Sequence, residues 1–187
     1  MAQILIAYAT KNGQTLKIAD FIGNELMKMG HRVDFYNCEQ KYDADPGQYH
    51  AVIVGGPVRF SSLPKPLEKW VRNHCAHLQA RPTVFFSVCL GILQKENERV
   101  QNEERQIVEN FFAKTHWHPV DWTIFAGALK YSQYNWFLKR LMHWISKKAG
   151  RTTDMSIDYE YTHWADVQAF VQKVDSFVQR HSEQPRA

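Results

Sequence analysis

The sequence predicts an α/β fold in which helices cover both faces of a doubly wound parallel sheet. Segments of strand composition alternate along the chain with segments of helical periodicity, which is the pattern of βαβ units. Residues 51–54 are apolar throughout, as expected of a strand that is covered on both sides. The length of 187 residues and the hydrophobic content of 44% suit one domain with a sizeable core. We therefore expect a single domain over residues 1–187.

The expected strands are short apolar or β-branched runs at residues 4–8, 33–36, 51–54, 83–88 and 122–125. Helices are expected where apolar residues recur every three or four positions, at residues 16–29, 67–78, 98–114 and 163–180. Thr162 is the expected N-cap of the last helix. A long insert at about residues 129–157 follows the fifth strand, and residues 158–161 are candidates to resume a strand.

Composition excludes several classes of protein. No stretch approaches the roughly 20 apolar residues of a membrane-spanning helix. The three cysteines are odd in number and lack CxxC spacing, so neither a disulfide framework nor a zinc site is predicted. Nine histidines are scattered, and the only close pair, His116 and His118, fits an exposed turn before Pro119. We therefore predict no metal site.

The net charge of +4 and the pI near 8.9 favour an anionic partner, namely a membrane surface, a carboxylated substrate or nucleic acid. Sequence signatures of nucleic-acid-binding modules are absent, so no nucleic-acid partner is expected. The chain begins almost directly with a strand and shows no secretory signal. We expect a cytoplasmic protein, or one that is peripheral on the cytoplasmic face of a membrane.

The turn between the first strand and the first helix predicts a phosphate site. There Gly13 permits a left-handed backbone, hydroxyl and amide side chains can donate, and the helix N-terminus adds its positive dipole end. An ordinary glycine turn would be an equal alternative for an isolated motif, but the position after an N-terminal apolar strand favours phosphate. No GxGxxG follows this strand and no P-loop motif occurs. The predicted phosphate-binding residues are Thr10, Lys11, Asn12, Gly13, Gln14 and Thr15.

Two further contact loops are expected after the third and fourth strands, because ligands of doubly wound sheets lie at the carboxyl ends of the strands. The first, residues 55–60, combines glycine flexibility with an apolar wall and one cation, and the second exposes backbone amides beside a flat apolar surface. Together they are expected to sandwich an isoalloxazine ring. The predicted contacts are Pro57, Val58, Arg59 and Phe60 in the first loop and Ser87, Val88, Cys89, Leu90 and Gly91 in the second.

In order and spacing these residues resemble the flavodoxin superfamily, and more narrowly the menaquinone-dependent protoporphyrinogen IX dehydrogenases, which act late in haem biosynthesis. The resemblance covers nearly the whole chain. It rests on TKNGQT at 10–15, GPVRF at 56–60, FFSVCL at 85–90, AGALKYSQYNWFLKRLMHWISKKAGRTTD at 126–154 and YTHW at 161–164. The basic and aromatic insert is the specific part, because generic flavodoxins lack it. The chain departs from the pattern at Cys89, where related proteins carry asparagine, and near Gly56.

The resemblance implies the flavodoxin-like strand order 2-1-3-4-5, FMN as cofactor, and oxidation of protoporphyrinogen IX or a similar tetrapyrrole to protoporphyrin IX. Electrons would pass to a membrane quinone, menaquinone or ubiquinone, at the cytoplasmic face of the inner membrane. The catalytic candidate is Arg59, which would stabilise charge on the reduced flavin or bind a substrate propionate bidentately. A surface arginine stacked on Phe60 is an equally good reading. Two other functions stay open: an NAD(P)H-dependent quinone reductase and a flavodoxin-like electron carrier.

The insert interleaves lysine and arginine with tyrosine, tryptophan and phenylalanine, and its apolar residues recur at helical spacing between Phe137 and Ile145. A basic amphipathic helix with aromatic anchors is typical of a segment that lies in an anionic membrane interface. The alternative is a helix whose apolar side packs on the domain while its basic side is solvated.

Overall fold

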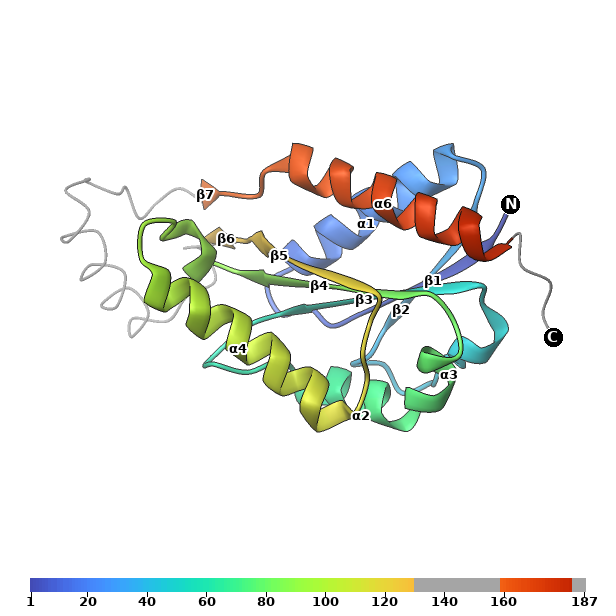
Figure 1. Cartoon of the computed structure of the whole chain (residues 1–187), viewed down its shortest axis with the longest axis horizontal. Coiled ribbons are helices and arrows are strands. Elements are labelled where there is room, and N and C mark those ends of the chain that lie inside the picture. The colour runs from blue at the N-terminus through green and yellow to red at the C-terminus, as the bar shows by residue number, and fades with distance from the viewer. Residues whose placement is uncertain (130–158, 183–187) are drawn as a thin grey trace.

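A parallel sheet between two helical layers forms the centre of the computed structural model, which describes residues 1–129 and 159–182 (Figure 1). The sheet has five strands in the order β2-β1-β3-β4-β5, and every pair is parallel. The predicted doubly wound fold and its strand order are thereby confirmed. The strands are β1 Gln3–Tyr8, β2 Arg32–Asn37, β3 Ala51–Pro57, β4 Thr83–Cys89 and β5 Asp121–Ala126.

Helices α1 (Gln14–Lys28) and α6 (Trp164–Ser182) cover one face of the sheet. Helices α2 (Lys65–Asn73), α3 (Cys75–Gln79) and α4 (Glu98–Thr115) cover the other. Successive side chains of a strand point to opposite faces, so Phe85 and Phe86 of β4 enter different cores. Burying each of these rings contributes about 1.5–3 kcal/mol.

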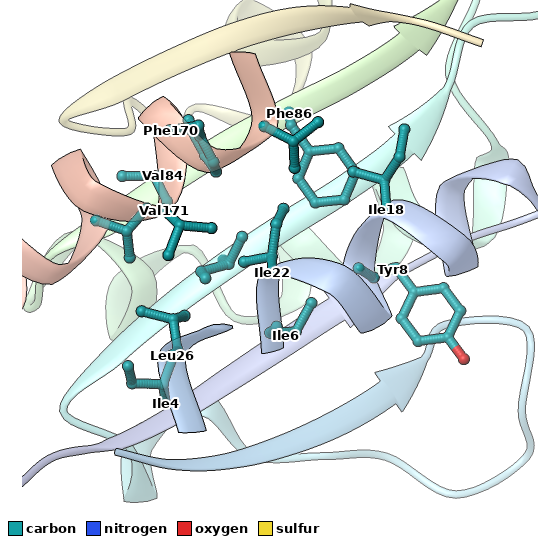
Figure 2. Close-up of a cluster of buried hydrophobic side chains, with 14 of the residues drawn as sticks. Ile4, Ile6, Tyr8, Ile18, Ile22, Leu26, Val84, Phe86, Phe170 and Val171 are labelled. Carbon is teal, nitrogen blue, oxygen red and sulfur yellow. The ribbon is translucent and has the colours of Figure 1, made fainter. Parts of the chain in front are cut away.

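The core under α1 and α6 joins the first and last helices of the chain. Figure 2 shows Ile18 and Ile22 of α1 directed toward Ile6 and Phe86 of the sheet, with Phe170 of α6 alongside. The opposite core is aromatic, and there the Phe85 ring packs 5.5 Å from Phe111 and 6.0 Å from Trp117, measured between ring centroids. Two sequence-distant helices therefore share one core, so the first helix depends on the last for its burial.

Three elements differ in detail from the sequence-based expectation. Strand β3 continues through residues 55–57, which were expected to form a flexible loop, because Gly55 pairs with Tyr8 and leaves room for the Phe86 ring. The helix expected at residues 67–78 is divided into α2 and α3 by a kink at His74 (φ −108°, ψ 13°). Thr162 lies one residue before the N-cap position of α6, and its hydroxyl donates to Ala126 O (2.8 Å).

Four short elements complete the described chain. The 3-10 turns are η1 Pro46–Gln48 and η2 Gly91–Leu93, and β6 (Ala128–Leu129) pairs antiparallel with β7 (Tyr159–Glu160). Of the strand predicted at 158–161, residues 159 and 160 form this separate small sheet with β6 and do not extend β5. The basic insert at 129–157 lies outside the described residues from residue 130 onward. Within the ranges 1–129 and 159–182, no helix has both the length and the apolar character needed to cross a membrane.

Candidate functional site at the carboxyl edge of the sheet

The loop after β1 is shaped by a left-handed glycine at the start of α1. Gly13 has φ 80° and ψ −8°, and its amide donates to Thr10 Oγ1 (3.1 Å). The first helical hydrogen bond runs from Lys17 N to Gly13 O (3.0 Å), so the amides of residues 14–16 precede it and lack an intrahelical acceptor. The first turn of α1 holds no acidic residue. These amides and the helix dipole form a site suited to a phosphate group.

The same loop is tied to the other end of the chain. The Gln14 side chain is buried, and its Nε2 donates to Thr162 Oγ1 (2.9 Å), which in turn donates to Ala126 O. The Gln14 amide group is thus engaged within the protein, and a phosphate would meet the backbone N–H of this residue. Thr15 is also buried, with 2% of its surface exposed.

Backbone hydrogen bonds join the loops along this edge of the sheet. Ala9 N donates to Gly55 O (3.0 Å), Val58 N to Val88 O (2.9 Å), and Gly127 N to Cys89 O (3.1 Å). The residues after β1, β3 and β4 are therefore adjacent, as the prediction of three contact loops requires.

A tight turn follows β3. Arg59 and Ser62 exchange two backbone hydrogen bonds, of 2.9 and 3.1 Å, and the two residues between them have left-handed backbones, Phe60 with φ 48° and Ser61 with φ 55°. Phe60 is 88% exposed, and Arg59 Cζ lies 5.7 Å from the centroid of the Phe60 ring. Left-handed non-glycine residues cost about 1–3 kcal/mol each and gather at functional sites.

A groove of about 260 Å³ lies between this turn and the phosphate loop. It brings together Thr10, Lys11, Pro57, Arg59 and Phe60 from the predicted site. A more open concavity of about 810 Å³, lined by residues 93–98, contains none of the predicted residues, and a single continuous segment forms it. The groove is the better candidate for the functional site, because residues from several separate loops line it.

The groove also contains residues that sequence reasoning missed, of which Lys65 and Glu39 carry charge. Lys65 begins α2, directly after the β3 turn, while Glu39 follows the end of β2 by two residues. Both residues follow the carboxyl end of a strand, and this position could have indicated that they belong to the site. With Lys11 and Arg59, the groove presents three cations and one carboxylate.

The residues predicted after β4 divide into two groups. Ser87, Val88 and Cys89 are buried within the strand, whereas Leu90 and Gly91 are partly exposed. Among the described residues, no group forms a hydrogen bond with Ser87 Oγ. Leu90 and Gly91 are therefore the members of this predicted loop that have surface exposed to solvent.

Glu104 of α4 reaches the β4 loop and hydrogen bonds with the Cys89 thiol. Burial, with the Glu104 carboxylate as a second cause, raises the pKa of Cys89 to about 12, so the residue stays a thiol at neutral pH. Burial likewise raises the pKa of Glu104 above its ordinary value. Glu104 was not among the predicted site residues, because it lies on α4 and outside the loops that follow the strands.

Comparison with known proteins gives the family. The model of the flavodoxin domain matches residues 5–156, which is most of the chain. The chain belongs to the flavodoxin domain family. Rubredoxin oxygen:oxidoreductase from Desulfovibrio gigas shares the fold of this flavodoxin-domain chain, with a TM-score of 0.56 and 12% identity over 99% of the present chain and 37% of that one.

Curated relatives of this flavodoxin-domain chain include a protoporphyrinogen IX dehydrogenase [quinone] from Escherichia coli K12, 26% identical over 91% of this chain and 93% of its own length. A protein of the same name from Leishmania major is 29% identical over 89% of this chain and 71% of its own length. With the family and the fold, these relatives identify the chain as a flavin oxidoreductase. The donor set after β1 fits the phosphate of such a cofactor, because the amides of residues 14–16 precede the first helical hydrogen bond and the first turn of α1 holds no acidic residue.

Proposed function

We propose that the chain is an FMN-dependent dehydrogenase that oxidises protoporphyrinogen IX and passes the electrons to a membrane quinone. The observation that carries the proposal is the similarity to the Escherichia coli enzyme, which extends over about nine-tenths of both chains and is not confined to the flavin-binding part. The phosphate loop supports FMN in preference to riboflavin, because it suits a phosphomonoester.

Residues 10–15 would hold the phosphate, and the loops after β3 and β4 would flank the ring. FMN, when bound, supplies the two-electron redox chemistry, so the chain needs no nucleophile of its own. The tasks that fall to the protein are to hold the substrate against the ring and to keep water out. The exposed Phe60 ring offers an apolar surface next to the groove for a flat substrate.

Arg59 is the proposed catalytic residue. Its guanidinium borders the groove and is not paired with a carboxylate in any ion pair of the described residues, so it is available for an anion. A substrate propionate would accept two parallel N–H bonds from it, which fixes the substrate in position and orientation. The alternative, stabilisation of charge on the reduced cofactor, would use the same side chain.

Attachment to an anionic membrane is part of the proposal, because the electron acceptor is dissolved in the bilayer. The basic residues of the insert at 129–157 would supply the attraction, at about 1 kcal/mol for each charge near the surface. Vesicles of anionic lipid should sediment the protein at low salt and release it at high salt. Equal recovery with neutral vesicles at every salt concentration would contradict membrane attachment without affecting the assignment of substrate.

The deciding assay uses the purified protein with FMN bound. Protoporphyrinogen IX and a soluble menaquinone analogue are added without oxygen, and porphyrin fluorescence is followed. We expect fluorescence to rise well above the rate without protein and to depend on the quinone. If flavin is bound but the rate matches the uncatalysed control, the substrate is wrong. Quinone reduction that requires NAD(P)H would then point to a reductase.

A further inference from the structure

A second polar cluster lies outside the groove, at the amino edge of the sheet. It contains Asp43 and Asp45 from the segment between β2 and β3, and His74 and His77 from the helices that lead into β4. Since η1 runs into β3 and α3 runs into β4, this cluster is at the strand starts, whereas the groove is at the strand ends. Figure 1 shows α3 at the end of the sheet opposite β6 and β7.

The donor atoms of the cluster converge. One ligand atom each from Asp45, His74 and His77 lies within 4.8 Å of the other two. His77 Nδ1 is 2.9 Å from Asp45 Oδ1, and His74 Nε2 is 3.1 Å from both carboxylate oxygens of Asp43. The kink at His74 places this ring beside that of His77, with 6.3 Å between centroids. Two imidazoles and the Asp45 carboxylate therefore face one small volume, and the Asp43 carboxylate is hydrogen bonded to the His74 ring beside it.

Surrounding contacts hold this arrangement in place. Trp70 Nε1 donates to Ala44 O (3.2 Å), the carbonyl between the two aspartates, and the Trp70 ring packs 5.2 Å from that of His74. Tyr36 Oη donates to Tyr42 O (3.0 Å), which anchors the start of the same segment. On its other side the segment is fixed by Arg81, which donates to Pro46 O. The loop and the helices are thus positioned before any ion arrives.

The two sides of the cluster differ in their exposure to solvent. Asp43 is 62% exposed on its side chain, while that of His74 is only 14% exposed. An ion would therefore be anchored on a largely buried imidazole and remain accessible from the side of the aspartates.

We propose that His74, His77 and Asp45 bind a divalent transition-metal ion of the zinc type, with a water molecule in the fourth position. Two imidazole nitrogens with oxygen ligands are a set that Zn²⁺ accepts in tetrahedral geometry, whereas Mg²⁺ prefers oxygen ligands alone. The histidine pattern in the sequence predicts no metal site, and the proposal departs from that expectation because the two pairs converge in space. The proposal does not depend on the function of the groove.

Binding would replace the hydrogen bond between His77 and Asp45 with metal bonds that join three segments. The loop between β2 and β3 would then be fixed to α2 and α3. Because an ion that binds only the folded state stabilises it in proportion to RT ln(1 + [L]/Kd), zinc should raise the unfolding temperature of the holoprotein.

The test is a calorimetric titration of the FMN-loaded protein with ZnCl₂ after chelator treatment. We expect one ion per chain, and His77→Gln should weaken binding at least about tenfold, since even loss of an outer-shell partner costs about 10- to 100-fold. The matched control is His118→Gln, which changes an exposed histidine away from the cluster and should leave binding unaltered. Heat release that is the same in both variants, or no stoichiometric binding to the unmodified protein, would overturn the proposal.

A second measurement locates the ion directly. Crystals grown with zinc should show one anomalous peak between His74 and His77, and Asp45→Asn should reduce its occupancy. A peak at any other position, or none, would refute the site. The titration with MgCl₂ should give no binding, and equal binding of Mg²⁺ would refute the zinc-type assignment.

Discussion

The loop after β1 and the turn after β3 border the same groove but are built in opposite ways. In the β1 loop the polar groups are engaged locally or buried: Gly13 donates to Thr10, Gln14 to Thr162, and Thr15 is covered. In the β3 turn two non-glycine residues have left-handed backbones, and Phe60 is almost fully exposed. One region is formed in advance, whereas the other holds strain and uncovered apolar surface.

The difference matches two tasks that a redox enzyme must separate. A cofactor has to be retained through many cycles, which favours a rigid loop with fixed donors. A substrate has to enter and leave, which favours a surface that gains its partners only when the substrate is present. We therefore expect changes in the β1 loop to alter cofactor affinity and changes in the β3 turn to alter turnover.

The strongest expected effect is on the β1 loop. Thr15→Val should weaken FMN binding by about 10- to 100-fold, because a hydrogen bond to a charged group contributes about 1.5–3 kcal/mol. Riboflavin affinity should hardly change, since riboflavin lacks the phosphate. Fluorescence titration of both flavins measures this, and Thr115→Val, whose hydroxyl donates to Phe111 O in α4, is the matched control. Equal losses for both flavins would mean that the loop does not bind the phosphate.

For the β3 turn, Arg59→Ala should lower turnover of a carboxylated substrate by about tenfold, equivalent to about 1.4 kcal/mol, and leave FMN affinity unchanged. Arg59→Lys should recover only part of the loss, because lysine lacks the planar pair of donors. Steady-state kinetics on flavin-saturated protein separate the two variants, with the exposed Arg105→Ala as control. If Arg59→Ala weakens FMN binding instead of turnover, the β3 turn does not differ from the β1 loop in the way proposed.

A smaller effect is expected from backbone strain in the β1 loop. Gly13→Ala should cost about 1–2 kcal/mol of stability, because the left-handed conformation is unfavourable for alanine, and should weaken FMN by several-fold. Gly30 has the same kind of backbone, with φ 89°, and apart from its chain neighbours no atom of the described residues lies within 4 Å of the position that a β-carbon would occupy there. Gly30→Ala should therefore lose similar stability but no FMN affinity. Urea denaturation and flavin titration on both variants would test this. Equal loss of FMN affinity in the two variants would mean that the effect comes from lowered overall stability.

Relief of strain in the β3 turn should act in the other direction. Ser61→Gly should raise the free energy of unfolding by about 0.5 kcal/mol, since glycine accepts the positive φ. Ser62→Gly should lower it, because the Ser62 hydroxyl donates to Arg59 O (3.1 Å). Urea unfolding curves at pH 7 would measure both. A loss of stability in the Ser61 variant would show that the turn is unstrained.

The smallest effect is expected at the loop after β4, where three of the predicted residues are buried and two are partly exposed. Burial raises the pKa of Glu104, so its favourable contribution is complete below the ordinary carboxyl pKa and disappears as pH rises through the folded value. Glu104→Gln should therefore stabilise the protein at pH 7 relative to the unmodified chain, and give less advantage near pH 4. Unfolding midpoints at the two pH values test this, and an advantage that is greater at pH 4 would reverse the assignment.

Local patterns in the sequence were sufficient for the fold, because apolar runs and helical periodicity specify strands and helices that have few other ways to bury themselves. They were less informative where tertiary contacts decide. Gly55 joins β3 because the Phe86 ring needs the space. The contact of Glu104 with Cys89 and the cluster around His74 bring together residues far apart in the chain, as the separation of 31 between Asp43 and His74 illustrates. A single sequence shows that each of these residues is present, but it does not show which of them come into contact.

The hydrogen bond from Gln14 to Thr162 also concerns how the protein is made. The phosphate loop leaves the ribosome early in synthesis, whereas Thr162, the partner of Gln14, follows 148 residues later. Helix α1 also shares its core with α6. The first helix can therefore reach its final packing only after nearly the whole chain has been synthesised. We therefore expect the cofactor to bind late in synthesis. A chain truncated before α6 would leave the first helix without part of its packing.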